Sequence, residues 1–183
     1  MTLIIILVVA ALVAFYFVGV YNKLVRKRSM VEEGWSGIDV QLKKRYNLIP
    51  NLVETVKGYA THEKETLEGV INARNKALKA EGVGAQTQAE NQLNSALANV
   101  FALSESYPDL KANTNFLQLQ QELSSIEGDI EKARRYYNAT VRENNIMVES
   151  FPSNIVANSF SFFTSEYFEL EDEEQRSTPK VEF

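Results

Sequence analysis

Residues 3–20 read LIIILVVAALVAFYFVGV, an apolar run that contains neither a charged residue nor a proline. As a helix, about 18 residues rise about 27 Å, which is enough to cross the hydrocarbon layer of a bilayer. A helix also satisfies its own backbone hydrogen bonds in lipid. Tyr16 and Tyr21 lie near the end of the run, where amphipathic rings are favoured. The stretch therefore predicts a single membrane-spanning helix.

Four cations follow this run directly: Lys23, Arg26, Lys27 and Arg28. Such a cluster predicts that the remainder of the chain is cytoplasmic and that a very short N-terminus lies outside. Membrane lipid is the first expected partner, because each cation near an anionic surface contributes about 1 kcal/mol. A cleaved signal would need a basic segment before the run and a small-x-small site after it. Neither is present, so the pattern favours an uncleaved, single-pass anchor in the bacterial inner membrane.

Composition limits the remaining possibilities. The 183 residues carry a net charge of −5 and no cysteine, which excludes disulfides, a thiolate nucleophile and a cysteine-based zinc site. An acidic chain beside a bilayer also argues against a nucleic-acid partner. About 160 residues outside the membrane suit one domain. We expect an anchor at 1–22, a basic segment at 23–32, a helical bundle at 33–158 and an aromatic and acidic tail at 159–183.

A helical period begins soon after the anchor. Its apolar stripe, at alternating steps of three and four, comprises Trp35, Ile38, Leu42, Arg45, Ile49, Leu52, Val56 and Tyr59. Ser29 and Glu32 fit a capping box, which predicts a new helix start there and a hinge near residues 22–30. Pro50 interrupts the stripe without shifting its phase, so we expect one helix bent near residues 47–50.

Three more helices are expected. One covers roughly residues 63–79 after a break at 58–61, and Gly82 and Gly84 mark the turn that follows it. Thr87 and Glu90 form a second capping box, predicting the start of the third helix, which Tyr107-Pro108 ends.

The last helix has the most regular period and runs from a cap at residues 113–115 to about residue 149, before Pro152. No stretch alternates long enough for a strand. The sequence therefore predicts an all-α fold, an elongated antiparallel bundle with coiled-coil-like, shallow left-handed crossings.

Long blocks of the chain resemble the LemA family. They are EGWSGIDVQLKKRYNLIPNLV at 33–53, VKGYA at 56–60, ARN at 73–75, YPDLKAN at 107–113, ARRYYN at 133–138 and FPSN at 151–154. Gly34 stands where the pattern favours a small residue such as alanine, and it affects only local helix stability.

The resemblance implies a small bacterial membrane protein with one span and a cytoplasmic helical bundle. It implies no reaction. Some members belong to magnetosome membranes, and some are encoded beside membrane zinc metalloproteases, which implies such a protease as one candidate partner.

His62, Glu63 and Glu65 are the place where a histidine meets carboxylates. A helical zinc protease needs a second histidine four residues later, where Thr66 stands, so carboxylates at a helix start are the favoured interpretation. With one histidine and no phosphate-binding glycine loop, no catalytic, cofactor or metal residue is assigned, and metal-assisted hydrolysis is the least favoured function.

Arg45 breaks the first stripe, and Arg74, Arg134 and Arg135 also lie close to apolar faces. If Arg45 is buried, it needs a carboxylate from another helix, since an unpaired buried charge costs several kcal/mol. The favoured alternative is that Arg45 extends to solvent from the edge of the bundle.

A set of amides and phenols could fix helix register or line a ligand groove, and register is favoured. Its members are Asn47, Asn51, Tyr59, Asn75, Tyr136, Tyr137 and Asn138. The crowded aromatics after Pro152 must fold back or dock on a partner, and the terminal segment ending at Phe183 is the candidate docking peptide.

The favoured function is a non-enzymatic scaffold or adaptor that binds other membrane proteins and self-associates. The alternative is a ligand-sensing module with a pocket in the bundle.

Overall fold

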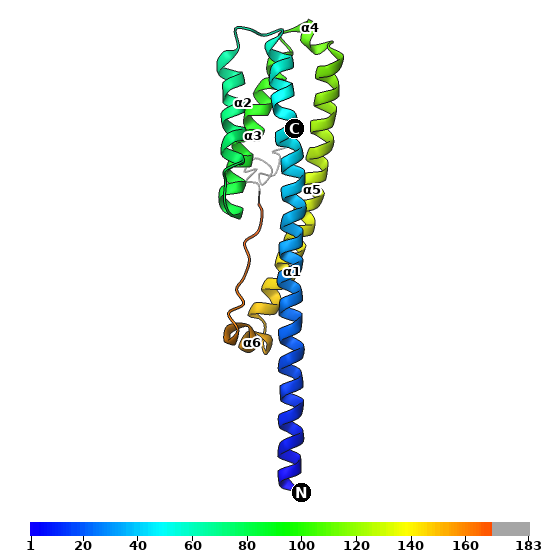
Figure 1. Ribbon diagram of the computed structural model, residues 1–183, viewed down its shortest axis with the longest axis vertical. Coiled ribbons are helices and arrows are strands. Elements are labelled where there is room, and N and C mark those ends of the chain that lie inside the picture. Colours follow the sequence, from blue (N-terminus) through cyan, green and yellow to red (C-terminus); the bar gives the residue numbers. More distant parts are fainter. Residues whose placement is uncertain (170–183) are drawn as a thin grey trace, which may run out of the picture. The chain divides into compact units, whose positions relative to one another are not determined.

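The computed structural model describes residues 1–169, and over that range it contains helices and no strand. The helices are α1 (Thr2–Lys57), α2 (Lys64–Ala77), α3 (Val83–Ser104), α4 (Pro108–Lys111), α5 (Thr114–Glu149) and α6 (Ser153–Ser159) (Figure 1). The all-α prediction is confirmed. The predictions for residues 170–183, including the docking segment that ends at Phe183, concern residues outside the described range.

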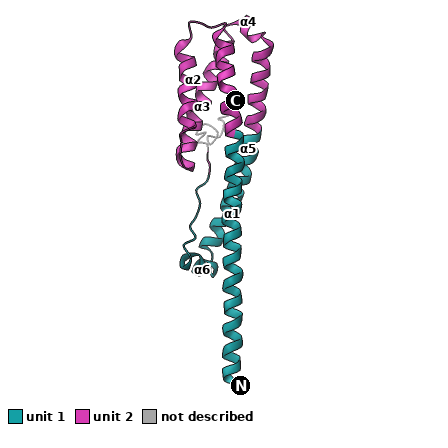
Figure 2. Cartoon of the chain, viewed as in Figure 1, with its two compact units in different colours: residues 1–41, 129–167 teal, residues 42–128, 168–183 magenta. Residues whose placement is uncertain are grey.

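The chain divides into two compact units (Figure 2). Unit 1 comprises residues 1–41 and 129–167, and unit 2 comprises residues 42–128 and 168–183. Both long helices, α1 and α5, contribute one part to each unit.

Helix α1 runs without interruption through the basic segment, so the predicted new start at Ser29 is wrong. Glu32 does not cap the backbone at Ser29; its carboxylate lies 3.8 Å from the Arg28 guanidinium, one helical turn away. The segment between Val20 and Glu33 contains no glycine or proline that would end a helix. The apolar run and the basic segment therefore belong to one helix.

The N-terminal part of α1 is the one candidate for a membrane span among the described residues. Residues 1–19 are all exposed, including Leu3 at 71% and Phe15 at 77%. So much uncovered apolar surface costs about 25 cal/mol per Å² in water, and lipid removes this cost.

Unit 2 is built from the end of α1, all of α2, α3 and α4, and the start of α5. Its four longer segments lie side by side, and successive segments run in opposite directions (Figure 2). The stripe on α1 faces this core, since Ile49, Leu52 and Val56 are each 0% exposed. The antiparallel arrangement agrees with the prediction.

Proline 50 lies inside α1 and does not end it, as the unchanged phase of the stripe predicted. Proline has no N–H, so the carbonyl of Tyr46, four residues earlier, loses its usual helical donor. The Nε of Arg74 on α2 donates to this Tyr46 oxygen at 2.7 Å. The bond lost at Pro50 is thereby replaced by a bond that joins α2 to α1.

The start of α3 differs from the prediction. The helix begins at Val83 after Gly82, whose φ of 83° suits glycine, and not at a capping box of Thr87 and Glu90. The Thr87 hydroxyl donates to the carbonyl of Val83, and Glu90 is 1% exposed. The capping interpretation is wrong because the Glu90 carboxylate bonds to side chains of α1.

The start and end of α5 follow the sequence signals. The Oδ1 of Asn113 accepts the backbone N–H of Phe116 at 3.0 Å, which is the bond of a helix cap. The helix then continues to Glu149, just before Pro152.

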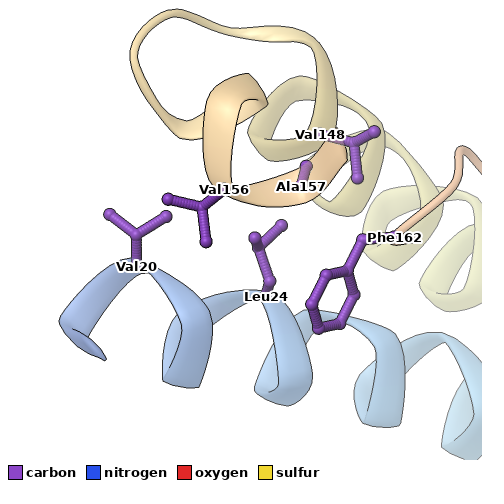
Figure 3. Close-up of a cluster of buried hydrophobic side chains, with 6 residues drawn as sticks. All are labelled: Val20, Leu24, Val148, Val156, Ala157 and Phe162. Carbon is purple, nitrogen blue, oxygen red and sulfur yellow. The ribbon is translucent and has the colours of Figure 1, made fainter. Parts of the chain in front are cut away.

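Unit 1 joins the first 41 residues of the chain to the end of α5, to α6 and to residues 160–167. A buried apolar cluster lies between α1 and α6 and consists of Val20, Leu24, Val148, Val156, Ala157 and Phe162 (Figure 3). Figure 3 shows Val20 facing Val156, and Leu24 lying between Val156 and Phe162. The segment after α6 thus folds back on its own unit, which was one of the two alternatives for the aromatic region.

Candidate functional site

Two charged residues of the described chain are almost fully buried, both in unit 2: Arg45 on α1, at 2% exposed, and Glu90 on α3, at 1%. The Nη2 of Arg45 donates to the carboxylate of Glu90. Its Nη1 donates to Glu127 on α5 at 2.5 Å and to Asn94 on α3 at 2.8 Å. The favoured prediction that Arg45 reaches solvent at the edge is therefore wrong. The alternative, a buried arginine paired with carboxylates of other helices, is confirmed.

Glu90 carries the network further. Its second oxygen accepts from the Tyr46 hydroxyl and, at 2.9 Å, from the side-chain amide of Gln86. The same amide lies 2.8 Å from the Tyr46 hydroxyl oxygen. Every oxygen of the buried carboxylate therefore has a donor, which offsets the large cost of removing it from water.

The electrostatics are asymmetric. Burial lowers the pKa of Arg45, and the neighbouring Glu127 carboxylate opposes that change. Glu90 is almost fully buried, whereas the Glu127 side chain remains 48% exposed. The buried arginine therefore has one enclosed partner and one partner that water still reaches.

Removing one partner of a buried ion pair typically costs about 3–5 kcal/mol, whereas replacing the whole pair by apolar groups is often neutral. The network is therefore poor evidence for extra stability. Its donors and acceptors match in only one alignment of α1, α3 and α5, so it specifies their register.

A groove of about 440 Å³ lies beside the network in unit 2. Its lining combines Arg45, Asn94, Gln120, Ser124 and Glu127 with Leu97, Ala98, Phe101 and Leu123. The volume falls within the range of small-molecule sites, and few polar groups converge on an apolar wall. The Nε of Arg45 is buried without a hydrogen-bond partner among the described residues.

The amides and phenols predicted as one set divide between the two units. Asn47, Asn51 and Asn75 are exposed in unit 2, so they do not fix register through burial. Tyr59 accepts from the Asn113 side chain at 2.8 Å, and the Asn75 oxygen accepts from Arg74 at 3.3 Å.

Three members of that set, and Arg134, belong to unit 1. Tyr137 is 2% exposed and donates to the carbonyl of Glu166 at 2.9 Å, whereas Tyr136 is 48% exposed. Arg134 and Asn138 are half-buried. Burial, and then Glu166, raise the pKa of Tyr137.

The four cations after the apolar run have different surroundings in unit 1. Lys27 pairs with Glu143 of α5, and that hydrogen bond holds the pKa of Glu143 below its usual value. The Arg28 guanidinium lies 5.4 Å from the centre of the Phe162 ring. Lys23 and Arg26 are exposed.

The region of His62 forms no catalytic constellation in residues 1–169. Glu63 accepts the Tyr107 hydroxyl at 3.1 Å, and burial and this bond raise the pKa of Tyr107. His62 itself is exposed. No group of three or more His, Cys, Asp or Glu side chains within the described range is arranged to hold a metal.

Sequence reasoning missed Glu90, Gln86 and Asn94 as partners of Arg45. A usable signal existed, because Gln86 and Glu90 continue the stripe of Leu93 and Leu97 at steps of four, three and four. A polar pair in phase with the stripe opposite an in-phase arginine indicates a buried network.

Comparison with known proteins agrees with this architecture. The sequence model of the LemA family matches residues 34–183. Protein LemA of Metamycoplasma hominis is 26% identical over 88% of this chain and 74% of its own length. Magnetosome protein MamQ 2 of Paramagnetospirillum magneticum is 26% identical and MamQ of Magnetospirillum gryphiswaldense 24%, each over 81% of this chain.

The chain spans 64% of the length of these two magnetosome proteins. The matched region covers far more than half of the chain. It includes the residues of the arginine network, the C-terminal part of α1 and the whole of α5. With its helical units and its long apolar N-terminal helix, the chain belongs to the LemA family.

Proposed function

We propose that this protein is a membrane-anchored, non-enzymatic adaptor whose helical part binds other membrane proteins at the cytoplasmic surface of the bacterial inner membrane. The observation that carries the proposal is α1, one helix whose residues 2–19 are exposed and largely apolar and whose later residues pack into both units. An anchor continuous with a packed helix holds binding surfaces at a set distance from the bilayer.

Two further features support an adaptor. The buried charges of unit 2 are engaged with one another, as expected for a scaffold and not for a catalytic site. In unit 1, Val40, Tyr136 and Ile146 keep large apolar side chains 49%, 48% and 56% exposed. Exposed apolar side chains of this size are common in protein interfaces.

Orientation has a direct test, since the chain contains no cysteine and single cysteines give a clean readout. A Thr2→Cys variant should react with a membrane-impermeant maleimide in intact cells, and a Val40→Cys variant only after permeabilisation. The opposite pattern would place the helical units outside and exclude cytoplasmic partners.

Partner binding is tested by a photo-crosslinking amino acid placed at Val40, Tyr136 or Ile146 in living cells. The matched control is Lys132, an exposed polar position of α5. Discrete adducts at the three apolar positions and none at Lys132 are expected. Adducts with a membrane metalloprotease or with a second copy would name the partner, and an absence of adducts at all positions contradicts the adaptor role.

The groove beside Arg45 favours one second candidate, a ligand-sensing function. A small molecule that binds the folded state raises stability by mass action, so cell-extract fractions should raise the melting temperature. A Ser124→Trp variant fills the groove and should abolish the shift. Ser125→Trp, on the next and exposed residue outside the lining, should keep it.

A further inference from the structure

The end of the apolar run and α6 meet in unit 1. Val20, the last residue of the run, and Leu24 are 7% and 0% exposed because Val156, Ala157 and Phe162 cover them (Figure 3). The short α6 therefore packs where α1 leaves the expected hydrocarbon layer.

The same segment also leaves apolar side chains largely uncovered. Phe151 is 80% exposed, Phe160 57% and Ile155 47%, all within ten residues of sequence. The Phe160 ring centre lies 4.9 Å from that of Tyr21, the first residue after the run. The Phe160 and Tyr21 rings therefore differ by at most 4.9 Å in depth, and both lie close to the end of the run.

The pairing of α1 with α5 gives the depth of Phe151. Lys27 pairs with Glu143, and a Cβ on Gly34 would meet the Cα of Tyr137 at 3.2 Å, so the two helices are antiparallel. Continuing this pairing beyond the end of α5 places Phe151 near the level of Val20. The exposed cations Lys23 and Arg26 follow within two turns of α1.

We propose that α6 and its flanking turns form an interfacial membrane contact, in which Phe151, Ile155 and Phe160 insert at the boundary between acyl chains and headgroups. This surface is named here the interfacial foot. Aromatic rings are favoured at that depth, and the cations beside it match anionic headgroups. The proposal rests on the membrane anchoring proposed above and adds a second contact that fixes the orientation of unit 1.

One phenylalanine provides a matched control. Phe163 is 77% exposed, close to the 80% of Phe151. Its carbonyl accepts from Asn144 at 3.3 Å, and Asn144 adjoins Glu143, the partner of Lys27. Along α1, the level of Lys27 is about seven residues, or about 10 Å, beyond Val20. A headgroup layer is about 6 Å thick, so this level lies outside it. The Phe163 backbone is therefore expected to lie beyond the headgroup layer, and Phe163 has the residue type of Phe151 and nearly the same exposure.

The test uses the full chain in vesicles of phosphatidylcholine and phosphatidylglycerol, with a single nitroxide label on a cysteine at one position at a time. The variants are Phe151→Cys, Ile155→Cys and Phe163→Cys, with Phe15→Cys in the span and Val40→Cys beyond it as references. All five positions are exposed, so labelling leaves the buried cluster intact, and circular dichroism verifies folding.

For each label we compare its accessibility to oxygen with its accessibility to a water-soluble nickel complex. This ratio should be several-fold higher at positions 15, 151 and 155 than at positions 40 and 163. If the labels at positions 151 and 155 show the accessibility of the label at position 40, while the label at position 15 shows that of lipid, the interfacial foot is absent and the anchor is retained. If the label at position 15 also shows the accessibility of a water-exposed site, the membrane anchoring itself is contradicted. Dipolar broadening at 151 and 155 would show that a second copy covers this surface, which overturns the lipid proposal.

Discussion

Units 1 and 2 use the same two long helices but hold them together by different chemistry. In unit 2 a buried arginine binds carboxylates from two other helices. In unit 1 the contact between α1 and α6 is apolar, and α1 approaches α5 closely at Gly34. Hydrogen-bonded charges allow few alignments of one helix relative to another, whereas apolar side chains can pack in many alignments. Unit 2 therefore contains a buried network of directional bonds, whereas the α1 contacts of unit 1 combine an apolar cluster and a close approach with the partly exposed Lys27–Glu143 pair.

The largest expected effect is the removal of the enclosed carboxylate in unit 2. Glu90→Leu leaves Arg45 with the half-exposed Glu127 and the neutral Asn94, and removing one partner of a buried ion pair typically costs about 3–5 kcal/mol. Chemical denaturation in detergent measures the loss. The double variant Arg45→Leu with Glu90→Leu should recover most of it, and equal losses in the single and double variants would contradict a network whose role is register.

The apolar contact between α1 and α6 in unit 1 should instead lose stability when a buried side chain is shortened and a cavity forms. Leu24 is fully buried, so Leu24→Ala is expected to cost about 2–5 kcal/mol and to loosen α6. Hydrogen exchange of α6 gives the local readout. Leu12→Ala, at a position 64% exposed, is the control and should leave α6 protection unchanged.

The replacement bond at Pro50 sharpens the view that unit 2 depends on directional bonds. Arg74→Met should cost about 1–3 kcal/mol because the Tyr46 carbonyl is left without a donor. In a Pro50→Ala background residue 50 supplies its own N–H, so the same Arg74 substitution should cost clearly less. A double-mutant cycle of unfolding free energies measures this coupling, and additive costs would show that Arg74 acts elsewhere.

Two glycines of α1 test close approach in unit 1. A Cβ on Gly37 meets nothing within 4 Å, so Gly37→Ala should stabilise by up to about 1 kcal/mol through helix propensity. A Cβ on Gly34 meets the Tyr137 backbone at 3.2 Å, and strain from crowding typically costs about 1–3 kcal/mol. Gly34→Ala gains the same helix propensity but meets this crowding, so its melting temperature should be clearly lower than that of Gly37→Ala.

The smallest effect is expected from pH. Lys27 lowers the pKa of Glu143 in the folded chain, so the pair stabilises unit 1 above the ordinary glutamate pKa of 4.5. This stabilisation is lost as the pH falls through the lowered pKa, because the carboxylate must then take up a proton. Melting temperatures at pH 6 and pH 3.5 should differ less in Lys27→Gln than in the parent chain.

The helices were largely predictable because their signals are local. Asn113 caps α5, Pro152 follows its end, and the break after Lys57 contains Gly58. The two wrong starts, at Ser29 and at Thr87, share one cause. A serine or threonine three residues before a glutamate fits a capping box, but Glu32 pairs with Arg28 and Glu90 with Arg45. A distant partner, Arg45, engages Glu90, whereas Arg28 is only one turn from Glu32 and the start at Ser29 is excluded by the continuity of α1.

The candidate site was only half predictable. The phase of Arg45 in an apolar stripe predicted that burial would require a carboxylate from another helix, but not which one. Glu90 and Glu127 lie 45 and 82 residues further along the chain, so only the packing of α3 and α5 brings them to Arg45.

By itself, the sequence determined the helical class, the single apolar run and most helix ends, because periodicity, capping and proline act over a few residues. Only the tertiary structure decided that Arg45 is enclosed, that Arg74 replaces the bond missing at Pro50, and that α6 packs against the end of the apolar run. Each of these depends on groups distant in sequence, whose encounter no local pattern encodes.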